Sequence, residues 1–206
     1  MLDESAYKHI YNHQKSNKNY IICDDMPYVK EKTLRLINQA IMLPAKHLSL
    51  NPKILDFGCR TGYYMQAISR DNPKCETFGI EILPEYVEVG LARGRTIVHG
   101  DATYCHEYFP EAYFDAVIAL HALEHLEDPH LALTNLRLVV KPKARCLLVV
   151  PLEGKGVRLS FTDKSNDKTK HRCQMPTEAA VREAIPKECW DIQFLQGSWE
   201  VILVAK

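Results

Sequence analysis

The chain has 206 residues, of which 46% are hydrophobic and 25% are charged, as is ordinary for one globular domain. Lys and Arg together number 26, and so do Asp and Glu; this balance excludes a dominant basic surface for nucleic acid, although not a local basic patch. No apolar run reaches the length that crosses a bilayer, which excludes a membrane-spanning helix.

A helix is the first element that the sequence predicts. Residues 1–27 are polar and rich in tyrosine, and apolar residues then recur at helical spacing, with Leu34, Ile37 and Ile41 on one face. We expect this helix to stop near Pro44, because a proline inside a helical pattern usually ends it.

Strands and helices alternate over the middle of the chain. Short apolar segments indicate five strands, at 53–57, 77–81, 96–98, 113–120 and 146–150. Helices are expected between them at 63–70, 84–93 and 128–140. Alternating strands and helices form right-handed βαβ units and therefore a parallel sheet. Ligands bind such sheets outside the carboxyl ends of the strands, so we expect the chemistry in the turns after the first four strands.

The last third of the chain differs from the middle. Residues 152–176 are polar and predict a long loop, and a short helix follows at 177–185. Two strands at 191–195 and 199–204, joined by a Gly-containing turn, indicate an antiparallel hairpin. The predicted fold class is therefore α/β, with a mostly parallel sheet that ends in a C-terminal antiparallel hairpin.

We treat the chain as one domain, with residues 1–45 as an N-terminal lid and helical segment and residues 46–206 as the core. Residues 1–28 and the loop at 152–176 are the material left to cover a site at the carboxyl edge of the sheet. We expect one or both to order over a bound ligand, as closing segments do.

Seven cysteines are scattered through the chain without a Cys-x-x-Cys pair. This odd number indicates free thiols in a reducing cytoplasm rather than a disulfide framework. The polar N-terminus, which lacks a signal-peptide core, leads to the same expected location. Cys105-His106 and His171-x-Cys173 lack the paired spacing of a zinc site, so we expect no metal.

The first motif lies between the first strand and its helix. Asp56 ends the strand, and Gly58 and Gly62 stand in the turn. Gly-containing turns let the backbone approach a ligand closely, and the following helix offers free N–H groups. A dinucleotide fingerprint would need Gly at positions that Arg60 and Tyr63 occupy, which disfavours a nicotinamide dehydrogenase.

Acids follow the next two strands. Glu81 ends the second strand, where a carboxylate can accept hydrogen bonds from both ribose hydroxyls of a nucleotide. The alternative is that Glu81 is a solvated acid at the start of a helix, where its negative charge interacts favourably with the helix dipole. Asp101 follows the third strand, where the alternative is a plain Gly-Asp turn.

Together these motifs resemble those of class I S-adenosylmethionine-dependent methyltransferases. Asp56, Gly58 and Gly62 match the acid-x-Gly-x-Gly-x-Gly motif of that family, and Arg60 replaces its middle glycine. The segment from Phe114 to Pro129 is similar to the family's fourth strand and its His-x-Leu-x-His segment. Leu136 to Pro142 is similar to its Arg-x-Leu-Lys-Pro-Gly-Gly turn, with Lys143-Ala144 in place of the glycines.

The resemblance implies a Rossmann-like sheet of seven strands and S-adenosylmethionine as cofactor. Asp101 would accept a hydrogen bond from the adenine amino group, the next backbone N–H would reach the ring, and Ile82 would pack on the adenine. The implied cofactor-binding residues are Asp56, Gly58, Cys59, Arg60, Gly62, Glu81, Ile82, Asp101, Ala102 and Leu120.

Three histidines are the candidate catalytic residues. His121 directly follows the fourth strand, His125 is four residues further on, and His171 lies in the polar loop. Histidine is the side chain best suited to take a proton at neutral pH, but methyl transfer needs a base only if the acceptor loses a proton in that step. The alternative is that each histidine simply bonds to a neighbouring carbonyl.

A small-molecule acceptor is favoured by what the sequence lacks. Enzymes that methylate exocyclic amines in DNA carry Asp/Asn-Pro-Pro-Tyr/Phe after the fourth strand, where this chain has Leu120-His-Ala-Leu, and the Pro-Cys of cytosine C5 enzymes does not occur. An RNA or protein acceptor is the second reading. Arg60 keeps a third reading open, a non-catalytic cofactor-binding partner subunit, and an oligomer also stays open.

Overall fold

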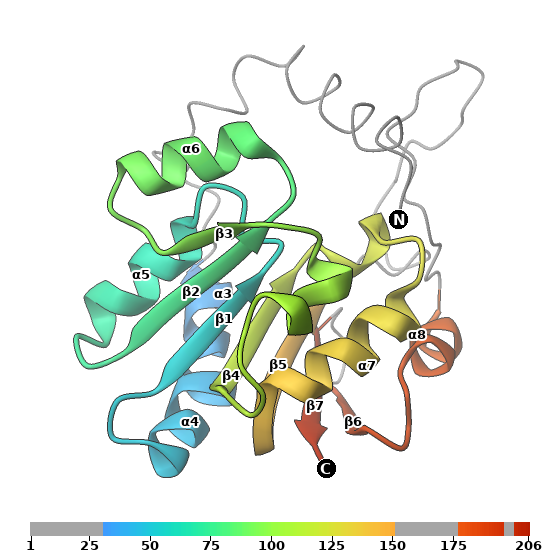
Figure 1. Cartoon of the computed structure of the whole chain (residues 1–206). Coiled ribbons are helices and arrows are strands. Elements are labelled where there is room, and N and C mark those ends of the chain that lie inside the picture. The colour runs from blue at the N-terminus through green and yellow to red at the C-terminus, as the bar shows by residue number, and fades with distance from the viewer. Residues whose placement is uncertain (1–30, 151–176, 196–199) are drawn as a thin grey trace.

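The computed structural model describes residues 31–150, 177–195 and 200–206, and their centre is a seven-stranded sheet in the order β3-β2-β1-β4-β5-β7-β6 (Figure 1). The strands are β1 (Lys53–Phe57), β2 (Glu76–Glu81), β3 (Ile97–His99), β4 (Phe114–Leu120), β5 (Val140–Val149), β6 (Trp190–Phe194) and β7 (Glu200–Ala205). Neighbouring strands from β3 to β5 pair in parallel, whereas β7 pairs antiparallel with both β5 and β6. The predicted fold class is confirmed.

Helices cover both faces of this sheet. They are α3 (Glu31–Leu36), the π-helical η2 (Ile37–Met42), α4 (Leu43–Leu48), α5 (Tyr63–Asp71), α6 (Pro84–Ala92), α7 (Pro129–Val139) and α8 (Glu178–Ala184). Two short 3₁₀ segments, η3 (Ala102–Glu107) and η4 (Leu123–His125), follow β3 and β4 and were not predicted from the sequence. Among the described residues no helix is long and apolar enough to span a membrane.

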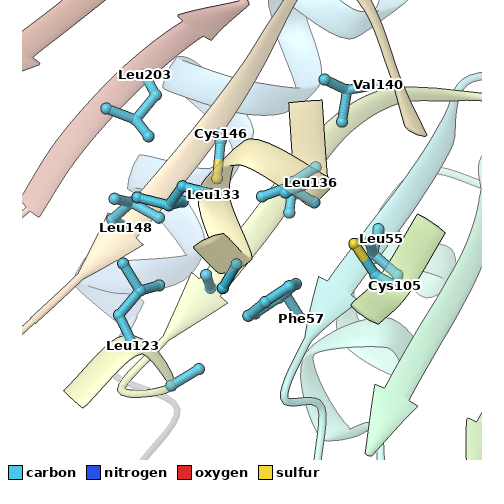
Figure 2. Close-up of a cluster of buried hydrophobic side chains, with 14 of the residues drawn as sticks. Leu55, Phe57, Cys105, Leu123, Leu133, Leu136, Val140, Cys146, Leu148 and Leu203 are labelled. Atoms are coloured by element: carbon cyan, nitrogen blue, oxygen red, sulfur yellow. The ribbon is translucent and has the colours of Figure 1, made fainter. Parts of the chain in front are cut away.

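The alternation of side chains along the strands divides the core between the two faces. Ile54, Ile118 and Leu147 face the helices from α3 to α5, where they pack with Ile37 and Ile41. The residues between them face the other way, into a cluster under α7 and α8. Figure 2 shows this second cluster, in which Leu133 and Leu136 of α7 lie among Phe57, Cys146 and Leu148 of the sheet. Because both faces are covered, β4 is buried along nearly its whole length, as its apolar sequence predicted.

The first helix does not stop at Pro44, and that prediction is wrong. It passes through η2 and continues as α4 to Leu48. Pro44 has no N–H to donate to the carbonyl of Ala40, four residues before it. The guanidinium of Arg145 on β5 lies 3.5 Å from this carbonyl oxygen. The wider π turn accommodates the proline, and the backbone N–H of Leu43 donates to Asn38 instead.

The fifth strand also begins earlier than the predicted residue 146. It starts at Val140, which pairs with Phe114, and the register shifts before Arg145 pairs with Ala116. Proline is tolerated in a sheet at such an irregularity, so Pro142 does not end the strand. Lys143, where the family motif has glycine, has a positive φ of 66°.

A charged cluster ties three strands together at the amino end of the sheet. The Asp115 side chain on β4 accepts a hydrogen bond from the backbone N–H of Lys53 on β1 (2.9 Å) and another from the ammonium of Lys141 on β5 (2.7 Å). The ammonium of Lys53 in turn donates to the hydroxyl of Tyr113 (3.0 Å). The cluster is at the opposite end of the strands from the predicted site, and we assign it to stability.

Candidate active site

The carboxyl ends of the first four strands meet, and they bring the predicted motifs together. The backbone N–H groups of Gly58 and Cys59 both donate to the carbonyl of Ile80 on β2, each at 3.1 Å. The backbone N–H of Gly100, after β3, donates to the Glu81 carbonyl at 2.9 Å. The turn after β4 reaches the same place, because a Cβ on Gly58 would lie 2.9 Å from that of Ala122.

The turn after β1 is held in a conformation that favours glycine. Gly58, Arg60 and Gly62 all have positive φ, at 76°, 52° and 81°. A left-handed backbone costs a non-glycine residue about 1 kcal/mol, so the Arg60 backbone conformation is strained. Arg60 is exposed, and its guanidinium lies 3.1 Å from the hydroxyl of Tyr86 on α6 and 5.2 Å from the centre of that ring. Cys59 is buried beneath the turn.

Glu81 is a buried carboxylate that the backbone holds in place. One oxygen accepts hydrogen bonds from the N–H groups of Ile82 and Leu83 (2.9 and 3.0 Å), and the other accepts from Arg60 (2.8 Å). Burial raises the pKa of Glu81, and these hydrogen bonds oppose the rise. A carboxylate offers about four acceptor sites, so about one remains for a ligand hydroxyl.

Asp56, at the end of β1, is a second buried acid. Burial and the charge of Glu81 raise its pKa to about 8, and no described residue donates a hydrogen bond to its carboxylate. An unpaired buried carboxylate is costly. A cationic group at this position would therefore be stabilised by Asp56, and would stabilise its ionised form.

The residues predicted to surround the adenine lie after β2 and β3. Ile82 is half-buried and its carbonyl is 3.0 Å from a ring nitrogen of His99. Asp101 caps η3, with its side chain accepting from the N–H of Thr103 at 2.9 Å. Ala102 is buried beside it. These side chains are thus on the same edge as Glu81, where an adenosine could span them.

The structure describes His121 and His125 but not His171, and the two described histidines lie in different surroundings. The backbone N–H of His121 donates to the carbonyl of Val149 (2.8 Å), and the φ of His121 is 54°. Leu120 before it is half-buried, and so is His125, which ends η4. His171 and the predicted lid segments lie outside the described residues, so their roles stay predictions.

Two residues at this edge were not predicted from the sequence as part of the site. Tyr86 is buried on α6 and partners Arg60. Glu124 is buried in η4, with a carboxylate oxygen 3.4 Å from Nδ1 of His121. Its only signal in the sequence is an acid between the two histidines of the His-x-Leu-x-His segment. Within the described ranges no group of three His, Cys, Asp or Glu side chains is arranged to hold a metal.

Comparison with known proteins identifies the family of this arrangement. The sequence pattern of a family described as "Methyltransferase domain" matches residues 28–187, which is most of the chain. No curated protein matches the chain significantly.

Solved structures with this fold come from several organisms. The complex between the Haloferax volcanii Trm112 methyltransferase activator and a putative methyltransferase matches at 17% identity and a TM-score of 0.58, covering 85% of this chain and 94% of that one. An S-adenosylmethionine-dependent methyltransferase of Methanosarcina mazei matches at 16% identity and a TM-score of 0.58, covering 77% and 93%. Phosphoethanolamine N-methyltransferase 2 of Haemonchus contortus, in complex with S-adenosyl-L-methionine, matches at 18% identity and 0.58, covering 74% of this chain but only 37% of that enzyme. At these identities the likeness shows the fold.

Proposed function

The chain belongs to the methyltransferase domain family, and from this premise we propose that it transfers the methyl group of S-adenosylmethionine to a small-molecule acceptor. The observation that carries the proposal is the pair of buried acids, Asp56 and Glu81, beside the Gly-containing turn at the carboxyl edge. A cofactor with ribose hydroxyls and a cationic amino acid end supplies a partner for each acid.

Each motif has a task in holding this cofactor. Glu81, fixed by three backbone N–H groups, accepts from a ribose hydroxyl. Asp56 faces the ammonium group of the methionine part, because no described residue donates a hydrogen bond to its buried carboxylate. Asp101 and Ile82 bind the adenine. Glycine at 58 and 62 permits the positive φ of the turn and its close packing, because a Cβ at either position would lie 2.9 Å from a neighbouring side chain.

The cofactor supplies an activated methyl group on a sulfonium, which an acceptor displaces in line. The protein contributes position, because holding two reactants in attack geometry removes much of the barrier. His121 stands at the end of β4, with its side chain 55% exposed at the edge where an acceptor would enter. It takes the acceptor's proton where the acceptor has one to lose.

The charge and the sequence after β4 support a small acceptor. The chain carries 26 basic and 26 acidic residues, whereas nucleic-acid binding domains are usually basic. Leu120-His-Ala-Leu stands where enzymes acting on DNA amines have their Pro-Pro motif.

Replacing Glu81 by Ala, or Asp101 by Ala, is expected to weaken binding of S-adenosylhomocysteine roughly 5- to 150-fold, since losing a buried hydrogen-bond partner costs about 1–3 kcal/mol. Calorimetric titration measures the change, with unfolding curves to show that each variant is folded. Glu88→Ala, an exposed acid on α6, is the matched control and should bind like the parent. Unchanged affinity in both site variants would contradict the assignment of this edge.

The acceptor class is tested with S-adenosylmethionine carrying a tritiated methyl group. A cell extract is separated by ultrafiltration into small molecules and macromolecules, and each fraction is incubated with the protein. We expect label to transfer to a compound in the small-molecule fraction. Label in RNA or protein instead would overturn the acceptor class, and no transfer with intact cofactor binding would favour a non-catalytic subunit.

Replacing Arg60 by Gly is expected to change the affinity for S-adenosylhomocysteine by no more than about twofold, as for a surface substitution. The reason is that its exposed guanidinium contacts Tyr86 on α6, and its charge has only a minor influence on the pKa of Glu81. Tyr86→Phe, which keeps the ring and removes the hydroxyl, is the companion variant. In calorimetry, a clear loss in Arg60→Gly would mean that the guanidinium pairs with the cofactor carboxylate, and a clear gain that it obstructs the site.

A further inference from the structure

We propose that Glu124 is a positioning residue that holds the imidazole of His121 in the tautomer with its proton on Nδ1, so that Nε2 is free to take a proton from a hydroxyl acceptor. This inference rests on the proposed function and concerns the same site. It assigns a role to an acid that neither the motif nor the family match singles out.

The burial of Glu124 needs an explanation. Its side chain is 2% exposed, and no residue that the structure describes gives its Oε2 a hydrogen-bond partner. A buried carboxylate costs several kcal/mol unless it is paired, so a purely structural position would favour an apolar residue. Within the described ranges the nearest basic group to Glu124 is His121, whose Nδ1 is 3.4 Å from Oε1 and which forms an ion pair with it only when protonated.

The backbone around the two residues fixes their distance. His121 is held by its N–H bond to Val149 and adopts a left-handed backbone, φ 54°, which a non-glycine residue rarely does. Such strain tends to persist where function maintains it. Ala122 and Leu123 between the pair are buried. The backbone of His121 is therefore held next to Glu124, while its side chain remains 55% exposed.

The tautomer follows from the chemistry of the pair. An ionised carboxylate only accepts hydrogen bonds, so it favours the tautomer with the proton on Nδ1, the nitrogen 3.4 Å from Glu124. Nε2 then has the free lone pair. The other titratable groups between β4 and α7 are His125, Glu127 and Asp128, and the β5 residue paired with the end of β4, Val149, is uncharged.

The arrangement fits an acceptor that loses its proton during transfer, which points to a hydroxyl. The acceptor oxygen forms a bond to the methyl carbon while the carbon–sulfur bond breaks, with its electron pair remaining on sulfur. The acceptor's proton passes to Nε2, and the resulting imidazolium is stabilised by Glu124 before it releases the proton to water. A neutral amine would not need this base, because it is already a good nucleophile and its ammonium product can lose a proton to water after the transfer, whereas a hydroxyl would give a strongly acidic oxonium ion.

The test is long-range ¹H–¹⁵N correlation spectroscopy of the full chain labelled with ¹⁵N-histidine, at about pH 8, where imidazoles are largely neutral. The His121 signals are assigned from the His121→Gln variant. We expect the Nδ1–H tautomer in the parent and its loss in Glu124→Gln. Glu111→Gln, an exposed acid at the other end of β4, makes the same charge change and should keep the parent spectrum.

An Nε2–H tautomer of His121 in the parent, or an unchanged spectrum in Glu124→Gln, would overturn the proposal. If Glu124→Gln does not fold, the parent spectrum alone decides. Binding of S-adenosylhomocysteine is measured on the same samples: a parent that does not bind it contradicts the proposed function, whatever the tautomer. In the labelled product, a methyl ether supports the hydroxyl acceptor and an N-methyl group overturns it.

Discussion

Replacing Asp115 by Ala is expected to lower the free energy of unfolding by about 3 kcal/mol, the lower end of the range for breaking a buried ion pair. The Asp115 side chain is fully buried and joins β1 to β5 through Lys53 and Lys141. Its loss leaves the backbone N–H of Lys53 unpaired and the ammonium of Lys141 without its counter-ion. Because the Lys141 side chain is 35% exposed, water solvates part of that charge, and the effect stays below that of a fully buried pair.

Urea unfolding measures this change, and Glu76→Ala is the matched control. Glu76 also lies near Lys53, at 3.9 Å, but its side chain is 52% exposed. Exposed ion pairs contribute about 0–1 kcal/mol, so this variant should unfold almost like the parent. Similar small losses in both variants would show that the Asp115 cluster does not hold the sheet.

The parts of the fold that followed from the sequence are those set by local chemistry. β1 and β4 were predictable because apolar residues on both faces of a strand require cover on both sides. The common location of Asp56, Glu81 and Asp101 was predictable because strand ends in a parallel sheet meet at one edge, whereas their roles stay predictions. Gly58 and Gly62 indicated the tight turn after β1, because glycine readily adopts the positive φ that such turns need.

The parts that did not follow depend on distant partners. Pro44 should end a helix by local rules, but Arg145, far along the chain, lies close to the carbonyl that the proline cannot bond. Pro142 is tolerated because the pairing of β5 with β4 shifts around it. Glu124 appears in sequence as a surface acid next to His125, and only the packing of the turn after β4 buries it against His121.

The affinity for S-adenosylhomocysteine is expected to rise with pH up to about 8, by roughly tenfold per unit near neutrality. The pKa of Asp56 is raised to about 8 by burial and by Glu81, so the free protein carries a proton there at pH 7. If the ammonium group of the ligand binds the ionised form, that proton must leave. Binding at pH 7 should therefore release about one proton, and none in Asp56→Asn.

Titration calorimetry at pH 7 in two buffers of different ionisation enthalpy counts this proton. Stability gives an independent check with the opposite sign. Between pH 4 and 8 the unfolded chain has lost the Asp56 proton, whose ordinary pKa is about 3.9, while the folded chain still holds it. The free energy of unfolding should therefore fall as pH rises through this range, by up to about 1.4 kcal/mol per unit from this group, and the fall should be smaller in Asp56→Asn. An observed binding enthalpy that does not depend on the buffer would show that Asp56 is already ionised, or that the cation binds elsewhere.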